Sequence, residues 1–204
     1  MGSDVLAPPR VYLAGPDVFF PQPIQWAARK KSICQRYGLI GVSPLDDLLH
    51  EPDEWASFQL WRKIAMRNEA HIRNCQGVIA NLTPFRGPSA DAGTVYEVGF
   101  ARALGLALFG YATTTEPFLA RTLSAIGPVA TNGEGAWYDA DGLLVEQFGL
   151  FDNLMIEGGI REFGGIVSQH ADDGWRDLTV FERCVQAAAD ALRPESESTT
   201  SGDR

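Results

Sequence analysis

Cysteine is scarce in this 204-residue chain, because Cys34, Cys75 and Cys184 are its three cysteines and they lie far apart. That spacing excludes a disulfide framework and a Cys-x-x-Cys zinc or redox motif, so we expect three reduced, mostly buried thiols. Histidine also occurs only three times, and no cluster of metal ligands emerges. Apolar runs long enough for a membrane helix, about 18 residues or more, are missing, as is an N-terminal signal peptide. We therefore expect a cytoplasmic protein without a metal or cofactor.

Basic residues are in the minority. The chain has 17 Lys and Arg against 26 Asp and Glu, which gives a formal net charge of −9. Nucleic-acid-binding proteins normally carry a basic stripe, so we expect neither nucleic acid nor a membrane surface as a partner. The one tight basic cluster, Arg29-Lys30-Lys31, falls in a helical stretch and is expected to form a solvated face.

The remaining composition is that of a folded globular protein, with 45% apolar, 10% aromatic and 21% charged residues. A chain of this length suits one well-buried domain. We predict a flexible N-terminus over residues 1–9, a single domain over residues 10–193 and a disordered tail over residues 194–204, where Ser, Thr and Glu are frequent.

Short β-prone apolar runs alternate with helical patterns along the chain. The alternation predicts an α/β fold with a parallel sheet, helices on both faces and right-handed crossovers. We expect strands at residues 10–15, 39–42, 77–82 and 106–111, helices at residues 23–37, 57–74, 91–104, 116–126 and 179–192, a loop at residues 133–142 and a mixed segment at residues 143–155. Such sheets bind ligands at the carboxyl ends of their strands, which here are followed by residues 13–20, residues 81–91 and the loop after residue 111.

The most informative single stretch surrounds Glu97. It lies one or two turns inside a helix that begins near Asp91, where the helix dipole favours an anion, so we expect its carboxylate to be ionised at neutral pH. An ionised carboxylate in a cleft can act as a nucleophile, and Gly93 and Gly99 would let a flat ligand or a neighbouring strand approach. From spacing alone, the alternative remains open that Glu97 and Asp91 are ordinary acids near a helix start.

Four segments of the chain together carry a more specific signal. They are residues 11–19 (VYLAGPDVF), 75–87 (CQGVIANLTPFRG), 91–99 (DAGTVYEVG) and 145–155 (VEQFGLFDNLM). These segments resemble the successive motifs of the nucleoside 2-deoxyribosyltransferase family and occur in the family's order. Four ordered motifs are far more specific than any one of them.

The resemblance implies a flavodoxin-like doubly wound fold and an enzyme that exchanges the base of a 2′-deoxynucleoside for another free base. By motif, Glu97 would attack C1′ of the deoxyribose and form a covalent deoxyribosyl-enzyme, and a second base would then attack, with net retention. The resemblance gives Tyr12 the role of orienting Glu97 through its hydroxyl, although packing in the first strand is the alternative. Asp91 matches an aspartate near the base and sugar, where it can hydrogen-bond or pass a proton.

The resemblance also implies an oligomer with shared sites. Asn153 matches an asparagine that a neighbouring subunit supplies to the sugar 5′-hydroxyl, with Met155 close to the base. Phe19 follows the first strand, where it could either stack on the base or simply pack. Gly15 and Asn81 belong to the first and second motifs and are expected to line the substrate site.

One position departs from the family pattern. After the cysteine that precedes the third strand, the resemblance predicts an aspartate that protonates the departing base, whereas this chain has Gln76. An amide forms hydrogen bonds but supplies no titrating proton, so base preference and rate are both left open. The alternative is that Gln76 points away from the cleft.

Two other functions compete with the transferase. An N-glycosidase would use the same glutamate with water to hydrolyse deoxynucleosides or their 5′-monophosphates. A catalytically inert nucleoside-binding module would explain Gln76, but it has no use for a carboxylate aimed at C1′. We favour the transferase, because the Asn153 segment suits a free 5′-hydroxyl and a chain of net charge −9 attracts phosphates poorly.

Overall fold

The computed structural model describes residues 7–48, 50–162 and 165–193. The disordered tail expected over residues 194–204 lies outside these residues, as does most of the flexible N-terminus expected over residues 1–9. The limits of the single domain at residues 10 and 193 therefore stay a prediction. Among the described residues, none of the helices has the length and apolar character needed to cross a membrane.

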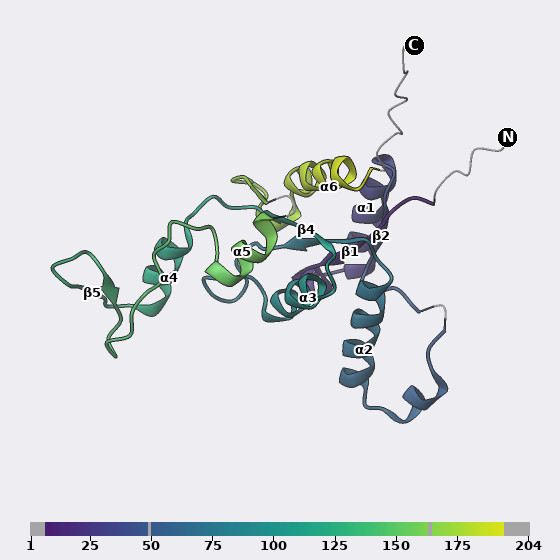
Figure 1. The fold of residues 1–204 in the computed structure, drawn as a ribbon, viewed down its shortest axis with the longest axis horizontal. Coiled ribbons are helices and arrows are strands. Elements are labelled where there is room, and N and C mark those ends of the chain that lie inside the picture. The colour runs from purple at the N-terminus through teal and green to yellow at the C-terminus, as the bar shows by residue number, and fades with distance from the viewer. Residues whose placement is uncertain (1–6, 49, 163–164, 194–204) are drawn as a thin grey trace, which may run out of the picture.

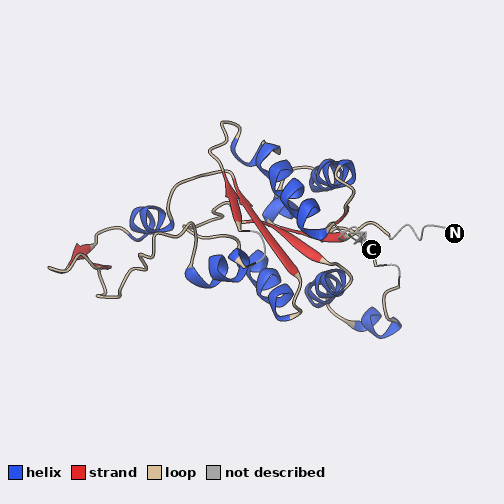
Figure 2. Ribbon diagram, turned by 45° about the horizontal axis from the view of Figure 1, so that its top comes forward, coloured by secondary structure: helices blue, strands red, loops and turns tan. Residues whose placement is uncertain are grey.

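Five parallel strands form the central sheet (Figure 2). They are β1 (Arg10–Ala14), β2 (Ile40–Val42), β3 (Gly77–Asn81), β4 (Ala107–Ala112) and β7 (Ile166–Ser168), in the spatial order β2-β1-β3-β4-β7. All four pairings are parallel. Counted within the sheet alone, this is the 2-1-3-4-5 order of flavodoxin-like folds, which reverses direction between β1 and β3. The predicted fold class is confirmed.

Helices cover both faces of the sheet (Figure 1). One face packs against α1 (Pro23–Arg36) and α6 (Thr179–Leu192), and the other against α2 (Leu60–Arg73), α3 (Ala92–Ala103) and α5 (Leu154–Arg161). We call these the α1/α6 face and the α2/α3 face.

Side chains alternate along β1, as the period of two in a strand requires. Val11 and Leu13 enter the core on the α1/α6 face, whereas Tyr12 and Ala14 enter the core on the α2/α3 face. This alternation directs Tyr12 toward α2 and α3, the helices that follow β2 and β3 in the chain. It decides which helices the tyrosine hydroxyl can reach.

The four predicted strands and five predicted helices are all present, with ends shifted by a few residues. The expected helix at residues 57–74 is present as α2 and begins at Leu60, shortly after the 3₁₀ turn η2 (Asp53–Ser57). Sequence reasoning missed β7 and α5, because β7 has three residues and α5 contains a pair of glycines. The three cysteines are buried and unpaired, as expected.

An arm extends from the sheet after β4 (Figure 1). It contains α4 (Phe118–Ile126) and a small antiparallel pair, β5 (Ala130–Thr131) and β6 (Trp137–Tyr138). The segment expected to be a loop at residues 133–142 is therefore partly a hairpin. The arm leaves large apolar side chains exposed, namely Ile126, Leu143, Leu144 and Phe148.

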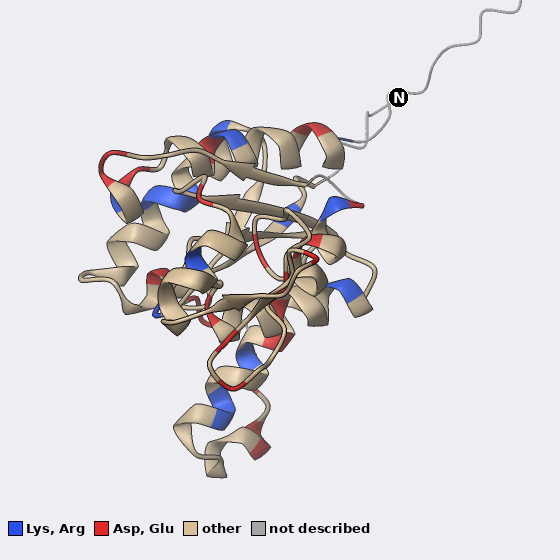
Figure 3. Ribbon diagram, turned by 90° about the vertical axis from the view of Figure 1, so that its left-hand side faces the viewer, with Lys and Arg blue, Asp and Glu red and all other residues tan. Residues whose placement is uncertain are grey.

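Acidic and basic residues are interspersed over the helices and loops (Figure 3). The expectation of a solvated basic face on α1 is wrong for Lys30, which is only 2% exposed. Its ammonium pairs with Asp17 and lies 4.7 Å from the ring centroid of Phe181. Lys30 is thus a buried partner of the loop after β1, and not part of a solvated cluster.

Candidate functional site

The candidate site lies where the strand order reverses, between β1 and β3. In open α/β sheets this reversal leaves a crevice at the carboxyl ends of the strands, and ligands bind there. The loop after β1 carries the 3₁₀ turn η1 (Pro16–Phe19), and the loop after β3 leads to the first turn of α3. These are the two loops that the sequence motifs occupy.

Glu97 and Tyr12 form the centre of the site. The Tyr12 hydroxyl donates a hydrogen bond of 2.6 Å to Oε1 of Glu97, and both side chains are buried. Glu97 lies in the second turn of α3, and Tyr12 reaches it because β1 directs this side chain to the α2/α3 face. The contact that the family resemblance implies is therefore present.

Asn68 on α2 is the third member of this group. Its amide Nδ2 donates to the same Oε1 of Glu97 at 3.2 Å, while its Oδ1 is buried and has no hydrogen-bond partner among the described residues. Sequence reasoning missed Asn68. The signal was available, because Asn68 lies four residues from both Ile64 and Ile72 and so shares their face of the helix.

Burial raises the pKa of Glu97 from 4.5 to about 7. Loss of solvation by burial is the largest cause, and the negative charge of Asp91 adds to it, while the hydrogen bonds from Tyr12 and Asn68 lower the pKa. The expectation of an ionised carboxylate at neutral pH therefore holds only in part, because desolvation disfavours the charged form of Glu97. Near pH 7 both protonation states of Glu97 are populated. Burial and Glu97 also raise the pKa of Tyr12, so its hydroxyl keeps its proton.

Asp91 is the N-cap of α3. Its Oδ2 accepts hydrogen bonds from the backbone N–H of Thr94 at 3.0 Å and from the Thr94 hydroxyl at 3.3 Å. A Cβ at position 93 would lie 3.0 Å from the same oxygen, so Gly93 avoids a close contact with the capping carboxylate. Asp91 thus has the capping role that a helix start favours, and its Oδ1 accepts no hydrogen bond from the described residues.

The loop before Asp91 is held by a fully buried carboxylate, Asp152. Its oxygens accept hydrogen bonds from the Ser89 hydroxyl at 2.5 Å and from the Ala90 N–H at 3.0 Å. Arg121 lies 3.9 Å from Asp152 and donates to the backbone carbonyl of Pro88. These contacts tie the start of α3 to the segment that precedes Asn153.

A second group of polar side chains lies at the carboxyl ends of β1 and β3. Asn81 donates to Asp17 at 3.2 Å, and Asp17 also accepts from Lys30. Gly15 makes this packing possible, because a Cβ there would lie 2.8 Å from the Cβ of Asn81. Sequence reasoning placed Gly15 and Asn81 here but did not single out Asp17 or Lys30.

Phe19 is 59% exposed at the end of η1. Its ring stacks on Phe85 from the loop after β3, with centroids 5.6 Å apart and an interplanar angle of 11°. The guanidinium of Arg86 lies over both rings. Phe19 thus packs on another loop of the site while one side stays open to solvent.

Gln76 does not lie with these groups. It precedes β3, and its Oε1 accepts from the Arg10 N–H at 2.8 Å at the opposite, amino edge of the sheet. The resemblance-based placement of Gln76 beside the departing base is therefore corrected. The alternative, that Gln76 points away from the cleft, agrees with this contact.

Asn153 and Met155 form no hydrogen bond with Glu97 among the described residues. Asn153 is the N-cap of α5, accepts from the Met155 N–H at 3.0 Å and donates to Glu146 at 2.7 Å. Both residues line a largely apolar groove of about 990 Å³ between α3 and α5, together with Val95 and Gly99. Met155 is 75% exposed there.

The described residues contain no group of three or more His, Cys, Asp or Glu side chains that could hold a metal ion. Glu97 itself presents a buried carboxyl with two neutral hydrogen-bond donors, Tyr12 and Asn68. Such a carboxylate can attack an electrophilic carbon as a nucleophile.

Comparisons with known proteins identify related sequences and folds. A sequence model of the family described as nucleoside 2-deoxyribosyltransferase matches residues 11–155. An uncharacterised protein of Schizosaccharomyces pombe is 36% identical over 170 residues, which cover 78% of this chain and 81% of the yeast protein.

Two solved structures share the fold. The 2-deoxyribosyltransferase of Leishmania mexicana has a TM-score of 0.59 and 27% identity, covering 88% of this chain and 98% of that one. A conserved protein of Enterococcus faecalis has a TM-score of 0.53 and 17% identity, covering 89% of this chain and 99% of that one. At that identity the bacterial protein supports the flavodoxin-like fold alone.

Proposed function

Because the chain belongs to the nucleoside 2-deoxyribosyltransferase family, we propose that it transfers the 2-deoxyribosyl group of a 2′-deoxynucleoside from one nucleobase to another. The observation that carries this proposal is the buried hydrogen bond of 2.6 Å between Tyr12 and Glu97 at the strand reversal. Together with the amide of Asn68, the Tyr12 hydroxyl holds Oε1 of Glu97 through neutral donors. The other oxygen, Oε2, is then the atom free to react.

In the first half-reaction, Oε2 of ionised Glu97 attacks C1′ as the C1′–N bond to the base breaks. The base leaves with the electron pair of that bond and takes up one proton, so the products are a neutral base and a deoxyribosyl ester of Glu97. Asp91 or a bound water passes this proton to the departing base. Tyr12 holds the carboxylate in place for the attack through its hydrogen bond.

In the second half-reaction, a nitrogen of the incoming base attacks C1′ of the ester and Glu97 leaves as a carboxylate. The incoming base releases one proton, which balances the proton taken up by the first. Each step inverts C1′, so the product has the configuration of the substrate. Water in place of the incoming base would give hydrolysis.

The other site residues have supporting roles in this proposal. Asp91 uses its free Oδ1 toward the base or sugar, while its Oδ2 caps α3. Gly15 and Asn81 shape the floor between β1 and β3. Phe19 offers its exposed ring face to the base.

The proposed substrate site also needs a second copy of the chain. Asn153 and Met155 lie in an apolar groove that Glu97 does not line, and the neighbouring arm exposes large apolar side chains. Exposed apolar patches of this kind mark protein interfaces. In the proposed homo-oligomer, Asn153 binds the 5′-hydroxyl of a substrate held by Glu97 of the partner, and Met155 contacts its base.

Incubation of the protein with 2′-deoxyinosine, with and without free adenine or cytosine, tests the reaction. Chromatography should detect 2′-deoxyadenosine or 2′-deoxycytidine together with hypoxanthine. Hypoxanthine alone would assign the N-glycosidase activity instead. If no product forms, the protein is a nucleoside-binding module. The same experiment determines which bases are accepted.

Mixed subunits test the shared site. The variants Glu97→Ala and Asn153→Ala should each be inactive alone, and mixing them should restore part of the activity, because some sites then contain both native residues. A protein that sediments as a monomer and is fully active at the same concentration would contradict the shared site.

We propose the cytoplasm as the compartment of this reaction, in keeping with three unpaired thiols.

A further inference from the structure

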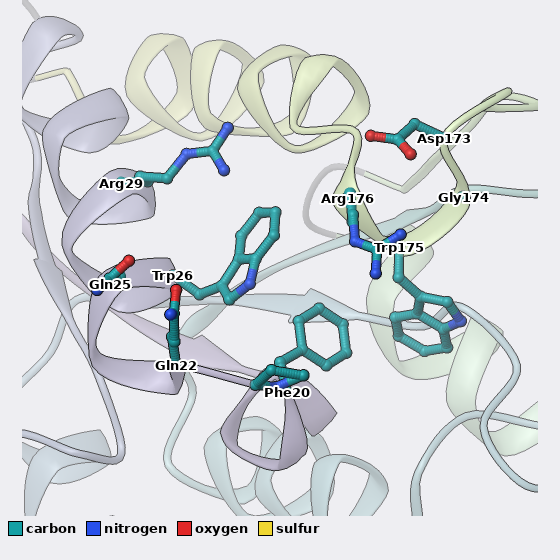
Figure 4. Close-up of a pocket in the computed structure, with 10 residues that line it drawn as sticks. Phe20, Gln22, Gln25, Trp26, Arg29, Asp173, Gly174, Trp175 and Arg176 are labelled. Atoms are coloured by element: carbon teal, nitrogen blue, oxygen red, sulfur yellow. The ribbon is translucent and has the colours of Figure 1, made fainter.

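A cavity of about 560 Å³ opens on the α1/α6 face, away from Glu97 and Tyr12. It lies between the end of η1, the first turns of α1 and the 3₁₀ turn η3 (Gly174–Arg176) that follows β7 (Figure 4). Its volume is within the usual range for small-molecule sites. The catalytic proposal makes no use of it.

Aromatic side chains form its walls. The ring of Phe20 lies 5.7 Å from Trp26 and 5.6 Å from Trp175, at interplanar angles of 83° and 90°. Both indoles are therefore nearly perpendicular to the Phe20 ring. Figure 4 shows them on opposite sides of the opening with Phe20 below. Walls of this kind suit a flat aromatic ring, which gains stacking free energy against an indole.

These walls are held in place by neighbouring loops. Trp175 also packs on Phe85, at 6.0 Å and 81°, and Phe85 stacks on Phe19. The loops after β1, β3 and β7 are thus joined by one continuous series of ring contacts. These contacts hold the cavity walls in position, which lowers the entropic cost of binding.

The polar groups at the cavity carry a positive balance. Arg29 lies 4.5 Å over the ring of Trp26, and neither Arg29 nor Arg176 forms an ion pair with a described residue. Asp173 is the one acidic side chain among the lining residues. These two guanidinium groups outnumber the single carboxylate, and guanidinium is well suited to binding phosphate.

We propose that this cavity binds a nucleoside 5′-monophosphate at a site separate from the catalytic centre. The base packs against the indoles of Trp26 and Trp175, the phosphate pairs with Arg29 and Arg176, and Asp173 accepts hydrogen bonds from the sugar hydroxyls. A flat ring and an anionic group in one small molecule match the two chemical features of the cavity. This binding does not depend on deoxyribosyl transfer, so it stands even where the exchange assay fails.

Calorimetric titration of the full-length protein with adenosine 5′-monophosphate, adenosine and inorganic phosphate tests the site. The nucleotide should bind at least about tenfold more tightly than adenosine, and phosphate alone should give no measurable heat. Arg29→Gln should reduce nucleotide binding to the level of adenosine. Trp175→Ala should weaken both nucleotide and nucleoside by at least about tenfold, because the stacking surface is lost.

Matched variants control for unspecific effects. Arg183→Gln removes an arginine on α6 that donates to Gln169, and Trp137→Phe changes an indole in the arm, so both should bind the nucleotide as the native protein does. Circular dichroism of each variant checks the fold. Unchanged nucleotide binding in Arg29→Gln, or displacement of the nucleotide by 2′-deoxyinosine, would overturn the proposal. The second result would place the nucleotide in the catalytic site.

Discussion

Two carboxylates near the strand reversal, the half-buried Asp17 and the buried Glu97, have opposite surroundings. Asp17 pairs with the buried ammonium of Lys30 and also accepts from Asn81, so its charge is compensated. Glu97 receives hydrogen bonds only from neutral groups, the hydroxyl of Tyr12 and the amide of Asn68, and its pKa rises to about 7. The first arrangement stabilises a loop, whereas the second keeps a carboxylate in an unfavourable environment.

This difference bears on reactivity. Burial of an uncompensated charge costs free energy, and that cost disappears when the carboxylate becomes a neutral ester. Formation of a deoxyribosyl ester at Glu97 would therefore relieve the desolvation. A lysine beside Glu97 would remove this advantage by stabilising the ionised form of its carboxylate.

The largest expected effect is on the chemistry at Glu97. Glu97→Gln removes the nucleophile while preserving size and hydrogen bonds, so the rate of base exchange should fall by about four orders of magnitude. The matched control is Glu69→Gln, because Glu69 also accepts from a tyrosine hydroxyl, that of Tyr96, but on the surface. Exchange rates of both variants are measured with 2′-deoxyinosine and adenine.

Covalent trapping sharpens the same prediction. A 2-fluoro-2-deoxynucleoside should leave a stable label on Glu97 of the native protein, detectable by peptide mass spectrometry. A label on another residue, or near-native turnover by Glu97→Gln, would remove Glu97 from the proposed role.

The next effect is on the stability of the compensated pair. Lys30→Met leaves the half-buried Asp17 without its buried cation, so the free energy of unfolding should fall by about 3–5 kcal/mol. Lys31→Met is the control, because Lys31 and Asp46 form a partly exposed pair whose loss should cost no more than about 1 kcal/mol. Urea unfolding measures both. Equal losses in the two variants would show that burial of Lys30 does not set the cost.

The third effect is a pH dependence of stability that Glu97 imposes. The folded protein keeps a proton on Glu97 up to pH about 7, while the unfolded chain releases it near pH 4.5, so between these values the folded state binds more protons. The free energy of unfolding should therefore fall as pH rises through this window, by about 3 kcal/mol in total.

Glu97→Gln, which does not titrate, isolates this contribution. The variant should be close to the native protein in stability below pH 4.5 and more stable than it above pH 7. Urea unfolding at a series of pH values measures the difference between the two proteins. A difference that stays constant with pH would contradict the raised pKa.

The comparison of the two carboxylates also shows how far sequence reasoning reaches. The fold class could be predicted from the alternation of strands and helices, and the pairing of Tyr12 with Glu97 could be predicted from the family resemblance. The protonation of Glu97 could not, since burial depends on tertiary packing that no local pattern contains. The burial of Lys30 within a basic cluster could not be predicted for the same reason.

Two other differences have a topological origin. Gln76 was placed at the site by motif, yet a residue that precedes a strand of a parallel sheet lies at the amino edge, opposite the loops that bind ligands. That argument was available from the predicted strands. Strand β7 was not, because three residues between glycine and polar positions give no period to detect.

The smallest expected effect concerns the neutral donors that distinguish Glu97 from Asp17. The hydrogen bond from Tyr12 lowers the pKa of Glu97, so Tyr12→Phe should raise that pKa further, by about one unit, and reduce exchange by about 10- to 100-fold at pH 7. Because only ionised Glu97 attacks C1′, kcat/KM should rise with pH to a plateau, with a midpoint near 7 in the native protein. In Tyr12→Phe this midpoint should move to higher pH.

The pH profile separates this role from mere packing. Asn68→Leu should move the midpoint in the same direction but less, because its contact with Glu97 is longer, 3.2 Å against 2.6 Å. Tyr96→Phe, which removes the exposed hydroxyl bonded to Glu69, is the matched control and should leave the midpoint unchanged. A rate loss in Tyr12→Phe without any shift of the midpoint would mean that Tyr12 supports the site by filling space, and that its hydroxyl does not set the ionisation of Glu97.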